Sequence, residues 1–121
     1  MKVSDIMISP VVVTQKNRTI GHAKELLERK HINAIPVLSM EGKIEGIITA
    51  TDVIREADNE ILVENIMATK THVVGIDSGV KDAAKMMLKH QVHHLVAMDE
   101  GQVVGIVSSM DFVSVVASDV G

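Results

Sequence analysis

The fold of this chain is decided by a stretch that occurs twice, first as Gly46-Ile47-Ile48-Thr49-Ala50-Thr51-Asp52 and again as Gly105-Ile106-Val107-Ser108-Ser109-Met110-Asp111. In each copy an apolar run typical of a β-strand leads directly into hydroxyl side chains and an Asp, which favour the start of a helix. The chain therefore contains two strand-to-helix junctions of the same kind.

The duplication extends outward from these junctions. Upstream, Val3-Ser4-Asp5-Ile6-Met7 recurs as Val63-Glu64-Asn65-Ile66-Met67, and Gly42 corresponds to Gly101 after a deletion of one residue in the second copy. We assign residues 1–60 to a first motif and residues 61–121 to a second. A lone motif of this length buries only about 60% of the surface of its unfolded chain, so we expect the two to pack on each other.

Each copy contains the same succession of elements. The first is predicted to hold a short β run at 11–13, a helix capped by Thr19 and ending at Lys30, strands at 34–38 and 44–48, and a helix that opens at 49–52. The second repeats this order at 73–74, 80–90, 94–98, 103–107 and 108–111. A β-α-β-β-α unit that occurs twice predicts an α/β (α+β) fold.

Composition excludes several classes of protein. A net charge of −4 argues against a dedicated nucleic-acid binder, and Phe112 is the only aromatic residue available for base stacking. The absence of Cys excludes disulfides and thiol nucleophiles. No apolar run approaches the roughly 18 residues of a membrane span, and the start of the chain does not resemble a secretory signal. We expect a cytoplasmic protein with neither a membrane nor a nucleic-acid partner.

The two junctions are the candidate binding sites. Thr49, Thr51 and Ser108 offer hydroxyls, and Asp52 and Asp111 offer carboxylates, at helix N-termini where free backbone N–H groups favour phosphate. A carboxylate can also accept hydrogen bonds from both hydroxyls of a ribose. The same residues are equally suited to capping a helix and nothing more, and the sequence leaves both interpretations open.

The whole pattern resembles a known family. The order of an Ile-Met segment, β run, amphipathic helix, Ile-Pro-Val strand, Gly turn and Gly-Ile-Ile-Thr-x-x-Asp junction is similar to the cystathionine β-synthase (CBS) domain, here twice, over residues 1 to about 58 and 62 to about 121. Such a pair resembles a Bateman module, in which two CBS motifs pack sheet to sheet about a pseudo-twofold axis. The resemblance implies clefts that bind AMP, ADP, ATP or S-adenosylmethionine.

The resemblance also implies roles for individual residues. It assigns Asp52 and Asp111 to the ribose hydroxyls, and Thr49, Thr51 and Ser108 to ribose or phosphate oxygens. Because clefts of this family are composite, it places Asp52 opposite Val92 and His93 of the second copy, and Asp111 opposite Ile32 and Asn33 of the first. Met110 stands where the second copy should have a hydroxyl, so we expect the Asp52 cleft to bind better.

The histidines do not indicate a metal or catalytic site. His93 and His94 are neighbours on a predicted strand, where consecutive side chains point to opposite faces, so they should not share an ion. His93 could contact a phosphate or merely line a polar wall. The others, His22, His31, His72 and His90, lack metal-ligand spacing and are expected on solvated surfaces. With no nucleophile elbow, P-loop or acid–base pair, we expect no enzyme, no metal and no required cofactor.

Two functions remain open. The first is a stand-alone regulatory module that binds an adenosyl ligand and signals to an unidentified protein, and the alternative is a ligand-free scaffold or oligomerisation module. In either case we expect a homodimer. The helix at 80–90 and the segment Phe112-Val113-Ser114-Val115-Val116-Ala117 carry more apolar surface than one sheet can cover.

Overall fold

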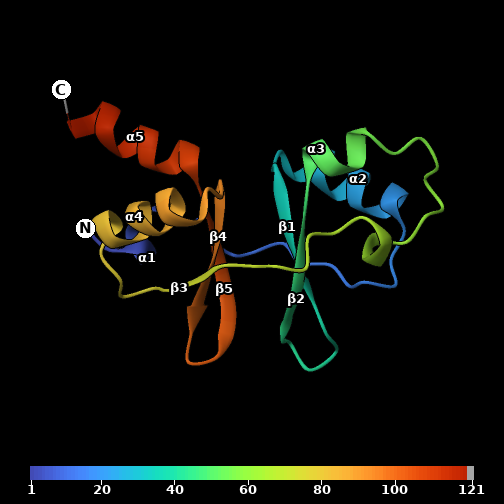
Figure 1. Cartoon of the computed structure of the whole chain (residues 1–121), viewed down its shortest axis with the longest axis horizontal. Coiled ribbons are helices and arrows are strands. Elements are labelled where there is room, and N and C mark those ends of the chain that lie inside the picture. The colour runs from blue at the N-terminus through green and yellow to red at the C-terminus, as the bar shows by residue number, and fades with distance from the viewer. Residues whose placement is uncertain (120–121) are drawn as a thin grey trace. The chain divides into compact units, whose positions relative to one another are not determined.

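The structure, a computed structural model, describes residues 1–119 and contains two small sheets and several helices (Figure 1). The chain folds as two compact units, which we call the β1–β2 unit, Val12–Thr71, and the β3–β5 unit, Met1–Val11 with His72–Gly121. The predicted mixed α/β fold class is confirmed.

The β1–β2 unit is a helix-covered hairpin. It comprises α2 (Ile20–Lys30), β1 (Ala34–Leu38), β2 (Ile44–Thr49), α3 (Ala50–Ile54) and the 3-10 helix η1 (Val63–Asn65), with β1 antiparallel to β2. Thr19 caps α2 as predicted, because its hydroxyl accepts a hydrogen bond from the His22 backbone N–H at 3.2 Å. The buried face of α2, with Ile20, Ala23, Leu26 and Leu27 at helical spacing, packs into one core with both strands.

The β3–β5 unit has the same plan and one additional strand, β3. It comprises α1 (Val3–Ile6), β3 (Val73–Gly75), α4 (Val80–His90), β4 (His94–Asp99), β5 (Gln102–Ser108) and α5 (Ser109–Asp119). In its sheet, β3 is parallel to β4 and β4 is antiparallel to β5. Ala83 and Met87 of α4 pack with Leu95 and Val107 of the strands in its core.

The two hairpin turns explain the one-residue deletion. The Ser39 N–H donates to the carbonyl of Lys43 at 2.8 Å, so the β1–β2 turn between them has three residues, Met40-Glu41-Gly42, and Gly42 adopts a φ of 82°. The β4–β5 turn has two, Glu100-Gly101, with φ values of 49° and 80°. A two-residue turn with positive φ at both positions matches the right-handed twist of the strands, whereas a three-residue turn needs one left-handed residue, usually Gly. The deletion therefore exchanges one standard hairpin turn for another.

Each sequence copy contains an Ile-Met segment, Ile6-Met7-Ile8 in the first copy and Ile66-Met67-Ala68 in the second. Each of these segments packs on the hairpin of the other copy. Ile8 and Ile106 exchange backbone hydrogen bonds of 2.9 and 3.2 Å, and Ala68 and Ile47 do so at 2.9 Å in both directions. The compact units are thus offset from the sequence copies, because each unit takes its hairpin from one copy and its Ile-Met segment from the other.

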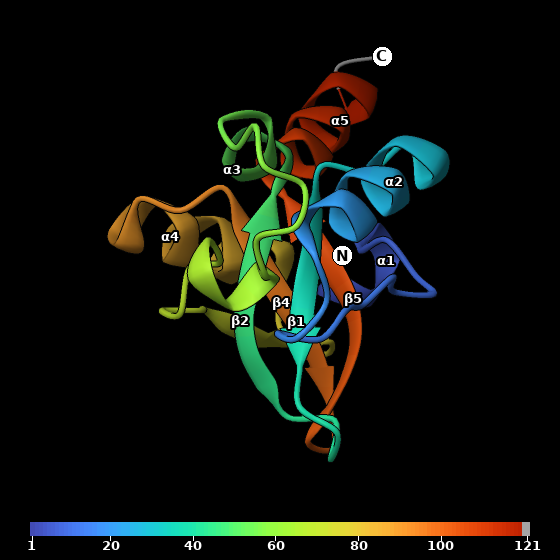
Figure 2. The same cartoon turned by 90° about the vertical axis from the view of Figure 1, so that its right-hand side faces the viewer.

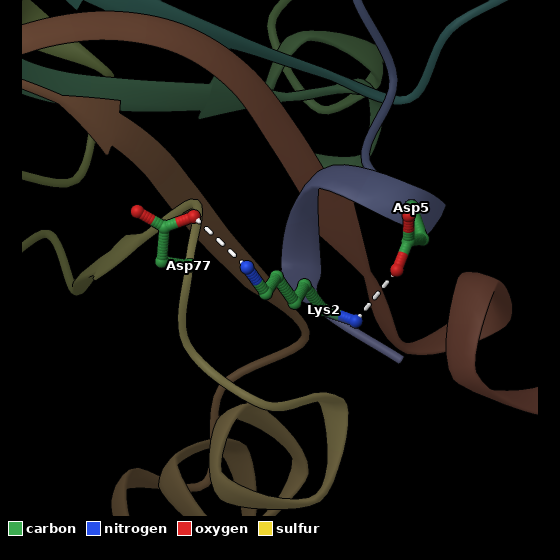
Figure 3. Close-up of polar contacts among 3 residues, drawn as sticks. All are labelled: Lys2, Asp5 and Asp77. Carbon is green, nitrogen blue, oxygen red and sulfur yellow. Dashed lines mark hydrogen bonds and ion pairs between the residues drawn. The ribbon is translucent and has the colours of Figure 1, made fainter.

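Short backbone bonds attach the N-terminal segment to the β3–β5 unit. The N–H groups of Val3 and Ser4 donate to the carbonyls of Ser78 and Ile76 at 2.9 and 3.0 Å. Figure 3 shows the accompanying side chains: Lys2 Nζ lies 3.6 Å from Asp77 Oδ1, while Asp5 caps α1 by accepting from the Lys2 backbone N–H at 2.7 Å. The ion pair is exposed, so the backbone bonds and the buried Val3 contribute most to this attachment.

Two local expectations were wrong. The run Val11–Val13 forms no strand, and only the next residue, Thr14, bridges to Val37 of β1. His93 precedes β4 rather than lying within it. In the first case, pairing with a distant strand sets where extended structure forms, and a local pattern does not report such pairing.

Candidate ligand-binding site

The first junction, Asn33 with Thr49–Asp52, is built by a reciprocal cap and is called the Asp52 junction. The Thr49 backbone N–H donates to Asp52 Oδ2 at 3.1 Å, and the Asp52 N–H donates to Thr49 Oγ1 at 3.3 Å. The Ala50 N–H donates to the carbonyl of Asn33 at 2.8 Å, which ties the helix start to the residue before β1. Capping is therefore a real role of Thr49 and Asp52.

The second junction, His93 with Ser108–Asp111, has the same frame and is called the Asp111 junction. The Ser108 N–H donates to Asp111 Oδ2 at 2.7 Å, and the Ser109 N–H donates to the carbonyl of His93 at 2.9 Å. The hydroxyl is used differently, because Ser108 Oγ donates to Asp111 Oδ2 at 3.2 Å. At the Asp52 junction, by contrast, the hydroxyl oxygen accepts and its proton stays available.

Both carboxylates keep one oxygen uncommitted. Within residues 1–119, the hydrogen bonds of Asp52 and Asp111 involve Oδ2 in each case, and none involves Oδ1. Both residues are half-buried, as are Thr49 and Ser108, whereas Thr51 is exposed. Each Asp can therefore cap its helix with one oxygen and accept a ligand hydroxyl with the other, so the two interpretations left open by the sequence are compatible.

The structure brings together the predicted site residues of each unit. Asn33 lies at the Asp52 junction and His93 at the Asp111 junction, with their carbonyls bonded as described, and the half-buried Ile32 and Val92 directly precede them. The expected composite pairing, in which Asp52 faces His93 and Asp111 faces Asn33, stays a prediction. The phosphate argument from the helix dipole weakens at Asp52, because α3 has only five residues.

The surroundings of His94 clearly change the pKa of its side chain. Burial lowers the pKa of His94 from the ordinary value of 6.5, and the neighbouring His93 lowers it further, while Asp111 opposes both effects. His94 pairs with Ser108 across β4 and β5, which explains its proximity to the Asp111 junction. No role of its own was assigned to His94 from the sequence. The alternation of side chains along a strand indicated only that those of His93 and His94 should point to opposite faces.

The described residues contain neither a metal cluster nor a membrane helix. Among residues 1–119 no group of three or more His, Cys, Asp or Glu side chains is arranged to hold an ion. In the same part of the chain no helix has both the length and the apolar character needed to cross a membrane.

Comparisons with known proteins give the repeat an identity. The CBS domain family profile matches residues 3–59 and 63–118. The crystal structure of the CBS domain pair of protein MJ0100, in complex with 5′-methylthioadenosine and S-adenosyl-L-methionine, superposes with a TM-score of 0.90 at 30% identity, over 98% of each chain.

Curated relatives include both small and large proteins. The CBS domain-containing protein YhcV of Bacillus subtilis is 29% identical over 90% of this chain and 81% of its own. Homoserine O-acetyltransferase of Methanosarcina acetivorans is 30% identical over 88% of this chain but only 20% of the enzyme. The chain spans less than half the length of several such relatives. Since the family profile matches both copies, the chain belongs to the CBS domain family and carries two CBS domains in tandem.

Proposed function

We propose that this chain is a regulatory module that binds an adenosyl ligand through the Asp52 and Asp111 junctions and signals its binding to an unidentified protein. The observation that carries the proposal is the pair of half-buried carboxylates, each fixed by Oδ2 and free at Oδ1 within the described residues. A fixed acceptor loses little conformational entropy when it binds a ribose hydroxyl. The likeness to the MJ0100 domain pair, solved with two adenosyl compounds, supports the ligand class.

The geometry favours the Asp52 junction as the stronger site. The Thr49 hydroxyl accepts from the backbone and can still donate its proton, whereas the Ser108 hydroxyl already donates to Asp111. Thr51 adds a second exposed hydroxyl, and the equivalent position holds Met110, whose side chain offers no donor. A ligand with oxygen acceptors should therefore bind more tightly at Asp52.

The direct test is calorimetric titration with AMP, ADP, ATP, S-adenosylmethionine, 5′-methylthioadenosine and NAD. We expect at least one adenosyl compound to bind. A charge-assisted hydrogen bond contributes about 1.5–3 kcal/mol, so Asp52→Ala should weaken that binding roughly 10–150-fold, and Asp111→Ala should weaken it less.

Variants can separate binding from capping. Asp52→Asn retains an oxygen that can cap the Thr49 N–H but loses the charged second acceptor, so it should lower affinity while leaving the unfolding midpoint nearly unchanged. Asp99→Ala, which removes an exposed carboxylate at the end of β4, is the matched control and should bind as the parent does. The proposal fails if no adenosyl compound binds at millimolar concentration, or if the Asp52 and Asp111 variants bind as tightly as the Asp99 control.

The alternative, a ligand-free scaffold, makes a different prediction at the same residues. If Asp52 and Asp111 serve only as caps, their replacement by Ala lowers the free energy of unfolding and changes nothing that depends on nucleotide. In the regulatory proposal the chain has no catalytic activity of its own and works in the cytoplasm. The homoserine O-acetyltransferase match covers too little of that enzyme to transfer its activity.

The regulatory module is further proposed to act as a homodimer through α4 and α5. A groove of about 540 Å³ lies on the β3–β5 unit and is lined mainly by apolar side chains, among them Ala84, Leu88 and Phe112. Leu88 is 79% exposed, and Val113 and Val116 of α5 are 56% and 65% exposed. In the other unit, Lys24 and Glu28 occupy the positions equivalent to Ala84 and Leu88. An apolar face of this kind on one unit favours a two-fold contact with a second copy.

Light scattering coupled to size exclusion tests this interface. The dimer should elute at twice the chain mass of 13.1 kDa, and Leu88→Glu or Val116→Glu should shift it to the monomer mass. Ile54→Glu is the matched control, because Ile54 is 78% exposed on α3 of the other unit. A parent chain that elutes at the monomer mass across micromolar concentrations would refute the dimer.

A further inference from the structure

A second pocket lies at the far end of the β1–β2 unit from the Asp52 junction. It has a volume of about 310 Å³, and its wall includes Thr14, Arg18 and His22 together with Ser39, which directly precedes the hairpin turn. Figures 1 and 2 both show this turn at the opposite end of β1 and β2 from α3, which carries Asp52. The pocket is therefore separate from the junction to which the adenosyl ligand is assigned.

Two residues that line this pocket, Thr14 and His22, each carry a buried and unsatisfied polar atom behind its wall. Thr14 Oγ1 and His22 Nδ1 have no hydrogen-bond partner within residues 1–119, although the Thr14 residue is only 4% exposed. These are the two buried, unpaired side-chain atoms of the described chain, and both residues line the same pocket. An unpaired buried polar group costs about 1–3 kcal/mol, so its presence calls for a partner. His22 was expected on a solvated surface. That expectation was wrong for its ring nitrogen Nδ1, which is buried.

The loop that carries Thr14 and Arg18 is held in place by backbone hydrogen bonds. The Thr14 N–H donates to the carbonyl of Pro36 at 3.1 Å, and the Leu38 N–H donates to the carbonyl of Thr14 at 2.9 Å. Val63 and Glu64 of η1 donate to the carbonyls of Arg18 and Lys16 at 2.8 and 3.0 Å. The pocket is consequently preorganised, because its loop is fixed to β1 on one side and to η1 on the other.

The internal repeat shows that these polar residues are not required by the fold. The positions equivalent to Thr14, Arg18 and His22 are Val74, Ser78 and Asp82. Val74 is buried in the core of its unit, so an apolar side chain of the same shape serves there. The β1–β2 unit thus has a hydroxyl where the other unit has a buried methyl group, and an imidazole where the other unit has a carboxylate.

The charge of the wall indicates the class of ligand. Its side chains include the guanidinium of Arg18, the amide of Gln15 and the hydroxyls of Thr14 and Ser39, and they include no carboxylate. Arg18 takes part in none of the ion pairs found within residues 1–119. Hydrogen-bond donors around an unpaired guanidinium form an environment that favours oxyanions, even in a chain of net charge −4. We propose that this pocket is a binding site for a small oxyanion, separate from the adenosyl site.

Inorganic phosphate and acetate are suitable probes, and they distinguish a phosphate from a carboxylate source of the oxyanion. Each is titrated into the full chain at constant ionic strength, with sodium chloride as balance, while backbone amide resonances are followed by NMR. We expect one of the two anions to shift the amides of residues 14–18, 22 and 39–42 saturably. Arg18→Gln should weaken that binding at least about tenfold, and Thr14→Val should weaken it without unfolding the chain.

Three variants serve as controls for this titration. Arg29→Gln removes an exposed arginine of α2 that pairs with Glu25, and should leave the anion affinity unchanged. Asp52→Ala and Asp111→Ala should also leave it unchanged, which separates this pocket from the adenosyl site. The proposal is overturned if neither anion gives a saturable shift, or if Arg18→Gln and Thr14→Val bind the anion as the parent does. It is equally overturned if Thr14→Val changes only the stability of the chain and not its anion affinity, since Thr14 then has a structural role alone.

Discussion

At the scale of single residues, the imidazole of His94 is the group whose protonation the fold opposes. It is half-buried at the start of β4, next to His93 and to the carboxylate of Asp111. Burial and the neighbouring imidazole lower its pKa more than Asp111 raises it, so the folded chain holds His94 neutral at pH values where the unfolded chain binds a proton.

This difference makes the free energy of unfolding depend on pH. Because the pKa of His94 is lowered by folding, the unfolded state binds more protons between that lowered pKa and 6.5. Stability should be fully present above pH 6.5 and should decrease as the pH falls below it. Urea unfolding measured between pH 7.5 and 5 should show this loss, and His94→Gln should reduce its slope. The exposed His31 provides the control, since an undiminished slope in His94→Gln and a diminished one in His31→Gln would contradict the assignment.

At the scale of elements, each Ile-Met segment packs directly against a glycine of a strand. Because glycine has no Cβ, the segment can lie close to the strand backbone there. A Cβ built on Gly46 would lie 2.7 Å from Met67 Sδ and 2.8 Å from the carbonyl oxygen of Ala68. A Cβ on Gly105 would lie 2.7 Å from Met7 Sδ and 3.0 Å from the carbonyl oxygen of Ile8. The carbonyls belong to the backbone that bridges the strand, so they cannot rotate away as a side chain can.

Substitution of either glycine by alanine should therefore destabilise the chain. We expect Gly46→Ala and Gly105→Ala to lower the free energy of unfolding by about 1–3 kcal/mol, the usual cost of overpacking. Gly75→Ala is the matched control on β3, because the nearest atom to its added Cβ would be Ser78 Oγ at 3.7 Å. Denaturant midpoints of Gly46→Ala and Gly105→Ala equal to that of the control would show that the segments can move away at no cost.

Some of these elements could be predicted from the sequence and others could not. The helices Ile20–Lys30 and Val80–His90 match their predictions because apolar periodicity is a local signal, as is the Thr19 cap of the first helix. Capping by Thr49 and Asp52 was one of the two interpretations that the sequence left open, and the structure shows these caps. The partner of the Met7 segment was not predictable, since both hairpins carry an equivalent glycine, Gly46 and Gly105, and the sequence does not say which one Met7 contacts. The burial of the Thr14 hydroxyl could not be predicted either, because it depends on the pairing of Thr14 with β1.

At the scale of the whole molecule, a fragment that follows the compact unit should fold better than one that follows the sequence copy. Residues 12–71 include Val63 and Met67, which pack against the core of the β1–β2 unit, whereas residues 1–60 lack both. We expect the fragment 12–71 to unfold cooperatively on heating, and the fragment 1–60 to show weak or no cooperativity. Both fragments are near the lower size limit for independent folding.

Circular dichroism during thermal unfolding compares the two fragments directly. Addition of the fragment 61–121 to the fragment 1–60 is the complementary measurement, because the missing Ile-Met segment then becomes available from a second chain. Equal cooperativity in 1–60 and 12–71 would contradict the importance of the exchanged segments.

The exchange of Ile-Met segments also has a consequence for the order in which the protein is assembled during translation. Synthesis proceeds from the N-terminus, and every residue of the β1–β2 unit has been made once Thr71 has been added. Met1–Val11 leave the ribosome before that unit, yet their partners Ile76, Ser78 and Ile106 are made after it. Residues 1–11 must therefore wait, with the apolar Val3 and Met7 unpaired, until Ile106 has also been synthesised.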